Sequence, residues 1–347
     1  MKRTFTLFVS LLFSISLFTT LANAQDRSPI ITRTFSASSM KAVEVSTSGG
    51  SIGVNGHAGS EAVVEVIVSS NNLRGNWSNE RIKQTLEENY ILDIRFESGI
   101  LYAVAKPLSR TSNLGRSGLN IAFKISVPRQ VNTNLRTSGG SIRINNLHGV
   151  QNFTTSGGSL TVGNVSGKIT GKTSGGSITV TDSGDDIDLK TSGGSITAKD
   201  CDGKINLSTS GGSLRMDNLS GNVNATTSGG SVTANNVRGT LKTGTSGGSI
   251  RINGLSGNVD AYTSGGSMTV DMKSVSEYVK LSNSGNLNLN LPSGNGYNLK
   301  ARAQKIETSG LKDFHGSMDS KNLEGTVSKG GAQIELKSSN RITLRFE

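Results

Sequence analysis

The sequence predicts an all-β protein, a single-stranded parallel β-solenoid (β-helix) built from coils of 18 residues. Three observations lead to this prediction. The tetrapeptide Thr-Ser-Gly-Gly recurs in constant phase, apolar and polar residues alternate between its copies, and only 33% of the residues are hydrophobic, beside 44 glycines and four prolines. A disordered Gly/Ser linker has no reason to keep phase, so the repeat favours a thin core that is built by stacking.

The first 24 residues have the pattern of a secretory signal peptide. Lys2 and Arg3 precede an apolar run, Phe5–Leu21, and the small residues of Ala22-Asn23-Ala24 suit cleavage after residue 24. We therefore expect an exported protein, periplasmic or at the cell surface. Its formal charge falls from +11 to +9 when the two cations leave. No later stretch is apolar enough to cross a bilayer, so we expect no integral membrane segment after cleavage.

Residues 25–130 are interpreted as an N-terminal strand region and cap. Asn79–Asn89 is predicted to be a short helix, because Ile82 and Leu86 lie four residues apart among charged residues. The Gly/Ser/Arg-rich stretch Ser109–Gly118 is predicted to be a mobile loop. Alternating apolar residues predict strands at Ala62–Val68, Ile91–Phe96, Leu101–Ala105 and Leu119–Val127.

Residues 131–280 are predicted to form the regular solenoid. Each coil buries its apolar residues only by stacking on the next coil, about 4.8 Å away. The paired glycines of each repeat suit a sharp corner, since glycine accepts positive φ and close backbone approach. The repeat Thr-Ser-Gly-Gly starts at Thr47, Thr137, Thr155, Thr173, Thr191, Thr209, Thr227, Thr245 and Thr263. The apolar residue after each Ser of the phased repeats forms a predicted ladder of Ile142, Leu160, Ile178, Ile196, Leu214, Val232, Ile250 and Met268.

Residues 281–347 lose the phase of the repeat but keep alternation, as in Leu287, Leu289 and Leu291. Two final strands are predicted at Ala332–Leu336 and Arg341–Phe346. An open end of a solenoid exposes strand edges that invite aggregation. We therefore interpret this region as degenerate coils followed by a C-terminal strand cap.

The chain resembles the bacterial putative-adhesin family of β-strand-repeat domains of unknown function. The resemblance rests on the signal peptide, on the strand ending in Ile125-Ser126-Val127-Pro128, and on the Thr-Ser-Gly-Gly-Ser-Ile repeats that follow. It implies a parallel β-helix at the cell envelope, and it transfers no catalytic residues. We expect a structural or adhesive module of the envelope, and its candidate partners are a cell-surface glycan and an envelope protein.

Four aspartates form a candidate metal site: Asp182, Asp185, Asp200 and Asp202. In the 18-residue register, Asp182 and Asp200 occupy one column about 5 Å apart. Like charges so placed repel unless water or a cation separates them, and Ca²⁺ prefers such oxygen ligands. A solvated acidic corner without any metal is the alternative. No other cofactor is expected.

The outward position after the apolar ladder residue gives a candidate glycan-binding ladder. It contains Arg143, Arg215 and Arg251, and the other five residues of the column are threonines. Arginine among hydroxyl groups suits anionic glycans. A threonine array can also match ice, although arginines interrupt this one, and threonine is also an ordinary residue of wet strands.

The sequence argues against catalysis and against nucleic-acid binding. Polysaccharide-acting enzymes on β-helices need carboxylates grouped in a groove, and most outward positions here are Thr, Asn, Ser or Gly. An enzyme of that class stays a remote alternative. Aromatic residues make up only 5% of the chain, too few for base-stacking platforms. The single cysteine, Cys201, falls in an apolar column and is interpreted as an inert core thiol.

Overall fold

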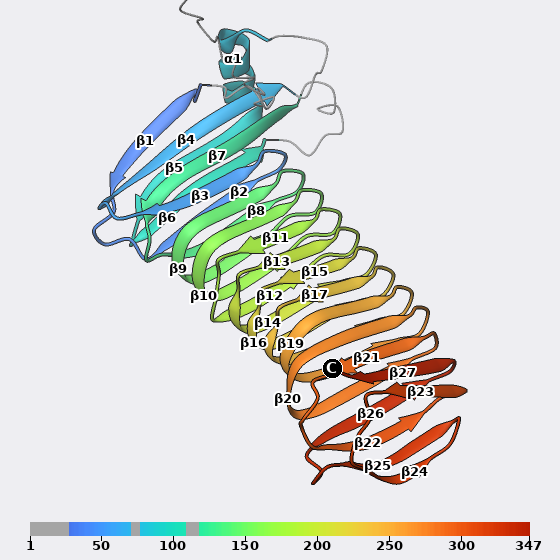
Figure 1. The fold of residues 1–347 in the computed structure, drawn as a ribbon. Helices are drawn as coiled ribbons and strands as arrows, with labels where there is room; N and C mark the ends of the chain where they lie inside the picture. The colour runs from blue at the N-terminus through green and yellow to red at the C-terminus, as the bar shows by residue number, and fades with distance from the viewer. Residues whose placement is uncertain (1–27, 71–76, 109–117) are drawn as a thin grey trace, which may run out of the picture.

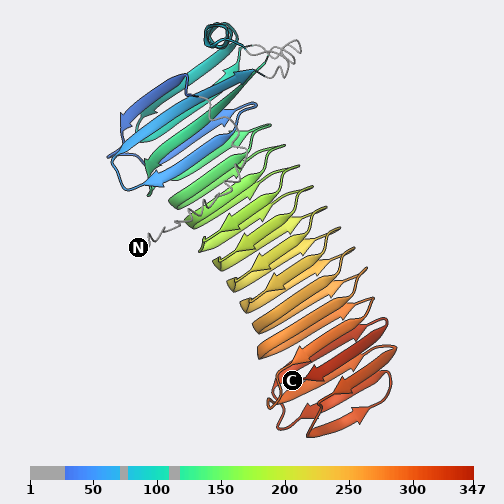
Figure 2. The same cartoon turned by 45° about the horizontal axis from the view of Figure 1, so that its top comes forward.

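The computed structural model describes residues 28–70, 77–108 and 118–347. The predicted signal peptide, and the predicted loop apart from Gly118, lie outside the described residues. The chain forms one long stack of coils, with the N-terminal region at one end and the C-terminal region at the other (Figures 1 and 2). Most neighbouring strands are parallel, which confirms the predicted β-solenoid class.

The N-terminal end holds eight strands and the one helix of the described residues. They are β1 (Ile31–Ser36), β2 (Ala42–Thr47), β3 (Ile52–His57), β4 (Glu61–Ser70), α1 (Asn79–Asn89), β5 (Tyr90–Glu97), β6 (Ile100–Pro107), β7 (Leu119–Pro128) and β8 (Asn132–Thr137).

The middle of the stack is formed by twelve further strands. They are β9 (Ile142–Thr154), β10 (Leu160–Lys172), β11 (Ile178–Thr181), β12 (Asp186–Lys190), β13 (Ile196–Lys199), β14 (Asp202–Thr209), β15 (Leu214–Asp217), β16 (Ser220–Thr227), β17 (Val232–Asn235), β18 (Arg238–Thr245), β19 (Ile250–Thr263) and β20 (Met268–Asn283).

The C-terminal end completes the stack with seven strands. They are β21 (Leu287–Leu291), β22 (Tyr297–Arg302), β23 (Lys305–Ser309), β24 (Phe314–Met318), β25 (Asn322–Val327), β26 (Ala332–Ser338) and β27 (Arg341–Phe346). Both strands predicted at this end, and the helix and strands predicted before residue 130, are present.

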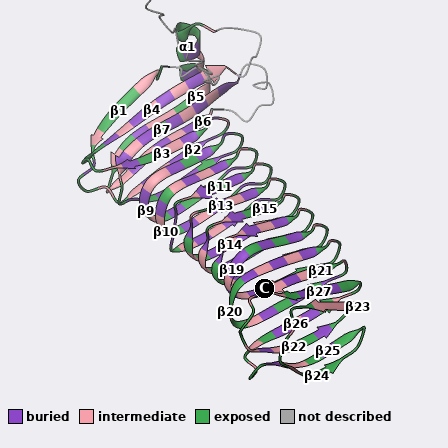
Figure 3. Ribbon diagram, viewed as in Figure 1, coloured by how far each residue is buried: buried purple, intermediate pink, exposed green. Residues whose placement is uncertain are grey.

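Each regular coil contributes one strand to each of two sheets. The short-strand sheet contains β11, β13, β15 and β17, and the long-strand sheet contains β12, β14, β16 and β18. Partners in both sheets lie 18 residues apart, as in Ile178↔Ile196 and Ile187↔Ile205. The inward side chains of the two sheets meet in a single apolar core, and buried and exposed residues alternate along the strands (Figure 3). Every residue of the predicted apolar ladder is at most 1% exposed.

One corner of each coil, here called the Thr corner, is formed by the Thr-Ser-Gly-Gly repeat. The Thr191 hydroxyl donates to the Gly176 carbonyl of the preceding coil (2.8 Å) and accepts from the Gly194 amide (3.3 Å). A Cβ added at Gly194 would lie 2.1 Å from that same carbonyl oxygen, whereas one at Gly193 would have an ordinary contact of 3.6 Å. The second glycine is therefore required by close backbone approach. Neither glycine of the pair has positive φ, which corrects that part of the expectation.

The opposite corner, here called the Asn corner, is where the backbone takes the left-handed conformation. Its φ values lie between 49° and 58° at Asn146, Asn164, Asp182, Asp200, Asn218 and Asn236, and Gly254 continues the column with φ 67°. Asparagine, aspartate and glycine tolerate this conformation best. The Asn corner therefore requires a residue that accepts positive φ, while the Thr corner requires a residue without a side chain at its second glycine.

The N-terminal end brings together residues that are distant in the sequence. The repeat unit at Thr47 stacks directly on the unit at Thr137, whose hydroxyl donates to the Gly50 carbonyl (2.9 Å). The segment between these units folds outward: β6 pairs with β2, β7 pairs with β3, and antiparallel β5, β4 and β1 complete the two sheets. Helix α1 lies at this end, with Ile82 and Leu86 buried.

The C-terminal end is also folded out of sequence order. Strand β26 lies between β20 and β22, and β27 lies between β21 and β23, so these last strands are inserted in the stack. Antiparallel β25 and β24 follow β22 at the outer end. The two predicted final strands therefore lie within the stack, and β23 and β24 form its outer edge.

Candidate functional site

The predicted Arg/Thr ladder is a continuous outward column on the short-strand sheet. Strand register places Arg143 beside Thr161, Thr197 beside Arg215, and Thr233 beside Arg251. The three arginines are therefore spread along the stack. Arg143 and Arg215 lie four coils apart, about 19 Å at the usual strand spacing.

The three arginines of the ladder differ in their partners. The Arg215 guanidinium binds the Asp217 carboxylate at 2.8 Å, and the same carboxylate accepts from the Asn235 amide at 2.5 Å. Within the described residues, Arg143 and Arg251 form no ion pair and are exposed. Arg215 is thus the least available of the three to a ligand.

The predicted acidic corner lies within the Asn corner column. Asp182 and Asp200 occupy equivalent positions in adjacent coils, because the residues directly before them, Thr181 and Lys199, are paired in the strand register. The Asp182 amide also donates to the Lys199 carbonyl. The Asn218 amide donates to the Asp200 carboxylate (2.8 Å), and this hydrogen bond lowers the pKa of Asp200 below its ordinary value. Lys199 also lies 3.3 Å from this carboxylate.

The other two aspartates of the predicted metal site are directed elsewhere. Asp185 accepts from the Gly167 amide of the preceding coil (2.8 Å), and Asp202 lies against the backbone of Gly184. Across residues 28–70, 77–108 and 118–347, no three His, Cys, Asp or Glu side chains form a group that could hold a metal ion. Calcium binding stays a prediction that rests on Asp182 and Asp200.

Cys201 lies in the core, next to the only hydroxyl in its column. Its side chain is 2% exposed, and burial raises the pKa of the thiol to about 11. The equivalent residue of the preceding coil is Ser183, whose hydroxyl donates to the Thr181 carbonyl (2.7 Å), and the thiol makes the same contact to Lys199 (3.2 Å). A buried neutral thiol is a poor nucleophile.

The Asn corner also carries a ladder of side-chain amides. The Asn164 amide donates to the Asn146 carbonyl oxygen (2.7 Å), and Asn236 donates in the same way to Asn218 (3.2 Å). The ladder ends at Gly254, which has no side chain. Lys273 of the next coil takes the vacant place, and its ammonium donates to the Asn236 carbonyl oxygen (3.1 Å).

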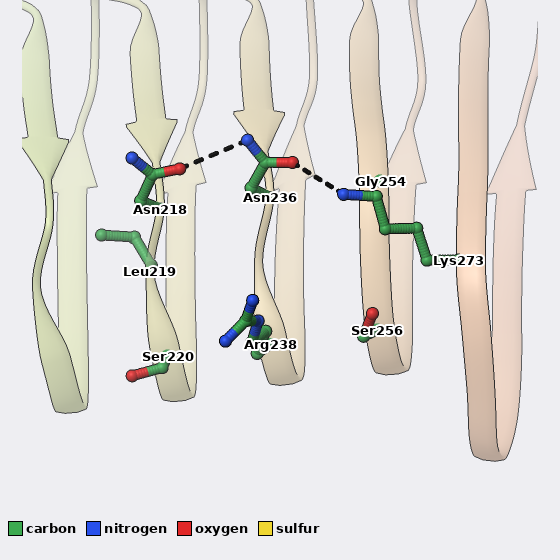
Figure 4. Close-up of a pocket in the computed structure, with 8 residues that line it drawn as sticks. All are labelled: Asn218, Leu219, Ser220, Asn236, Arg238, Gly254, Ser256 and Lys273. Carbon is green, nitrogen blue, oxygen red and sulfur yellow. Dashed lines mark hydrogen bonds between the residues drawn. The ribbon is translucent and has the colours of Figure 1, made fainter.

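A recess of about 510 Å³ opens where the amide ladder ends, and we call it the basic recess (Figure 4). Arg238 stands at its centre in the first outward column of the long-strand sheet. Short serine side chains flank it in both neighbouring coils, Ser220 before and Ser256 after. The recess is lined by Asn218, Leu219, Ser220, Asn236, Arg238, Gly254, Ser256 and Lys273.

The basic recess carries two positive charges that no acid neutralises within the described part of the chain. Neither Arg238 nor Lys273 forms an ion pair there, and no carboxylate lines the recess. Sequence analysis missed both residues. The available signals were the replacement of the corner asparagine by Gly254 and the loss of the repeat's phase after residue 270, which places Lys273 there.

The comparisons with known proteins support a repeat domain of unknown function. Residues 174–343 match the model of the family described as Toastrack DUF4097, and this span includes the whole basic recess. No curated protein matches the chain. The described residues contain no helix long and apolar enough to cross a membrane.

Three solved structures are similar to the chain at low identity. One is a "putative cell adhesion protein" from Clostridium sporogenes (10% identity, TM-score 0.20), with 91% of this chain and 99% of that one covered. Another is a "putative lipid binding protein" from Parabacteroides distasonis (13%, 0.30), with 92% and 97% covered. The third is a "putative adhesin" from Bacteroides fragilis (10%, 0.22), with 91% and 96% covered.

Proposed function

We propose, on the premise that residues 174–343 form a Toastrack DUF4097 domain, that this protein is an exported, non-catalytic structural and adhesive module of the cell envelope. The observation that carries the proposal is the unbroken stack. Most of its large apolar side chains point inward, and its outward columns are mostly hydroxyl and amide groups. A rigid rod with long polar faces suits holding a surface or a partner at a distance, and it needs no reaction centre.

The titratable groups support the absence of catalysis. A glycosidase needs a carboxylic acid whose pKa is raised so that it stays protonated. In the described part of the chain, the carboxyl groups whose pKa departs from its ordinary value all have a lowered pKa, and hydrogen bonds to the carboxylate are the main cause. These groups are Glu80, Asp200, Glu307 and Asp319. The one cysteine is buried and protonated at neutral pH.

A second candidate function is the binding of anionic glycans along the Arg/Thr ladder. The observation that favours it is the exposure of Arg143 and Arg251 without ion-pair partners in the described residues. Arg215 already forms an ion pair with Asp217, so Arg251 should contribute more to ligand binding than Arg215. Arg251→Ala should weaken glycan binding more than Arg215→Ala on the same array, and equal losses would contradict a specific role for this ladder.

The main proposal is tested on the full chain in its native compartment. Fractionation of cells should recover the protein in the envelope or outside the cell, with residues 1–24 removed as shown by N-terminal sequencing. Beads coated with the mature protein should adhere to envelope material, while beads coated with heat-unfolded protein should not. Recovery in the cytoplasm, or release of reducing ends from acidic polysaccharides by the wild-type protein, would overturn the proposal.

A further inference from the structure

We propose that the basic recess binds an oxyanion, a carboxylate or a sulfate ester, that is carried on a glycan chain. The proposal names a ligand class for the adhesive module and so rests on the proposed function, but it is independent of the Arg/Thr ladder. It rests on three features of the recess: its unpaired charges, its fixed donors and its size.

The charges of the recess select for an anion. Arg238 and Lys273 line it together, whereas no aspartate does, and two aspartates outside it accept hydrogen bonds from lining residues. Asp200 accepts from Asn218, and Asp271 accepts from the Gly254 amide (3.3 Å). An arginine offers a planar fork of donors that matches carboxylate and sulfate oxygens, while a lysine supplies a point charge beside it. A cation would meet two like charges in this place.

The donors of the recess are held in position before any ligand arrives. The Asn236 side chain is fixed at both ends, because it donates to Asn218 and accepts from Lys273. That contact holds the ammonium of an otherwise flexible lysine against the Asn236 side chain, in the lining of the recess (Figure 4). Preorganised groups lose less conformational entropy on binding, which favours affinity.

Glycine and serine make room for the ligand. A Cβ at Gly254 would lie 2.9 Å from Lys273 Cε and 3.2 Å from the Asn236 carbonyl oxygen, so the missing side chain is what admits the lysine. Ser220 and Ser256 leave space on both sides of Arg238, and their hydroxyls can bind sugar hydroxyls. A volume of about 510 Å³ lies within the range of small-ligand sites.

The lining favours a glycan over the other polyanions of a cell. No aromatic residue lines the recess, so nucleic-acid bases have no platform on which to stack. Leu219 is the one large apolar residue of the lining and is buried, which leaves no surface for acyl chains. Sugar hydroxyls next to a carboxylate or sulfate match the mixture of serine, asparagine and cationic groups.

The test compares two double variants with equal change in charge. In the mature full chain, Arg238→Gln with Lys273→Gln removes the cations of the recess, and Arg136→Gln with Lys242→Gln removes two exposed cations that belong neither to the recess nor to the Arg/Thr ladder. Calorimetry should show that the recess variant binds a sulfated or uronate oligosaccharide about tenfold or more weakly, and the control variant within about twofold of wild type. Equal losses in both variants would overturn the proposal, since they indicate diffuse charge attraction.

A second variant tests the geometry while keeping both charges. Gly254→Asn should fold, because asparagine tolerates the positive φ of this column in the neighbouring coils, and it should continue the amide ladder and displace Lys273. Its oligosaccharide affinity should fall about tenfold as well. Unchanged affinity in a folded Gly254→Asn protein would overturn the recess as the site.

Two further experiments distinguish an anion on a glycan from a free anion, and a failure of this inference from a failure of the proposed adhesive function. Inorganic sulfate should bind at least tenfold more weakly than the sulfated oligosaccharide, and equal affinity would overturn the assignment to a glycan. The recess variant should also be coated on beads. If those beads adhere to envelope material as wild type does and the variant keeps its oligosaccharide affinity, this inference fails while the adhesive function stands.

Discussion

The Thr corner and the Asn corner turn the same chain through each coil, yet they are built on different physics. At the Thr corner, the threonine hydroxyl is buried, and a Cβ on the second glycine would collide with the carbonyl of the preceding coil, so this glycine has no room for a side chain. At the Asn corner, the backbone needs only a residue that accepts positive φ, and its side chain stays outside. The first corner is therefore constant, while the second is free to carry charge, gaps and candidate sites.

The difference between the two corners is tested most strongly by replacing each glycine of one Thr corner with alanine in turn. In Gly212→Ala the new Cβ would lie 2.1 Å from the Gly194 carbonyl oxygen, whereas in Gly211→Ala it would lie 3.5 Å from the nearest atom. We expect Gly212→Ala to cost about 3 kcal/mol or more of unfolding free energy, because two stacked backbones must separate. Urea denaturation of both variants measures the difference.

The matched variant Gly211→Ala should stay within about 1 kcal/mol of wild type, since its new contact is an ordinary one. Similar losses in the two alanine variants would show that loss of glycine flexibility, and not close approach, governs the Thr corner.

A smaller effect is expected from the buried hydroxyl of the same corner. Thr209 donates to the Gly194 carbonyl (2.8 Å) and accepts from the Gly212 amide (3.3 Å). Thr209→Val keeps the shape of the side chain and leaves both backbone groups without this partner, which should cost about 2 kcal/mol. The control is Thr233→Val on the outward ladder, which should change the free energy of unfolding by less than about 0.5 kcal/mol. An equal cost in the two valine variants would contradict the hydrogen-bonding role of Thr209.

The smallest effect is expected at the Asn corner and depends on pH. The hydrogen bond from Asn218 lowers the pKa of Asp200, so the carboxylate is favoured in the folded protein. Its contribution to stability is present above the pKa of the unfolded chain and is lost as pH falls through the lower folded pKa. Asp200→Asn removes this titration, so its urea midpoint should fall less than that of wild type between pH 5 and pH 2.5. A gap between the two proteins that stays constant over this range would contradict the effect.

Local periodicity made the elements of this protein predictable from its sequence. Helix Asn79–Asn89 follows from Ile82 and Leu86, and the buried ladder from Ile142 to Met268 follows from alternation in phase with the repeat. Both patterns depend on residues a few positions apart or on an identical unit next along the chain. The roles of the corner residues were less accessible. The close approach at Gly194 depends on the coil before it, and the positive φ of Asn218 appears only in the folded backbone.

The arrangement of the ends was decided by strand edges that lie far apart in the sequence. Thr47 and Thr137 stack although 90 residues separate them, and β26 is inserted between β20 and β22, because an exposed edge pairs with whichever strand completes its hydrogen bonds. No local pattern encodes that choice.

The sequence by itself determined the period, the inward and outward faces, and therefore the parallel stack. The tertiary structure alone decided which outward groups are free to act. It pairs Arg215 with Asp217, and it brings Lys273, from the next coil but one, into the same recess as Arg238. The physical reason is that burial follows from a residue's own place in the repeat, whereas the availability of a charge depends on neighbours that other coils supply.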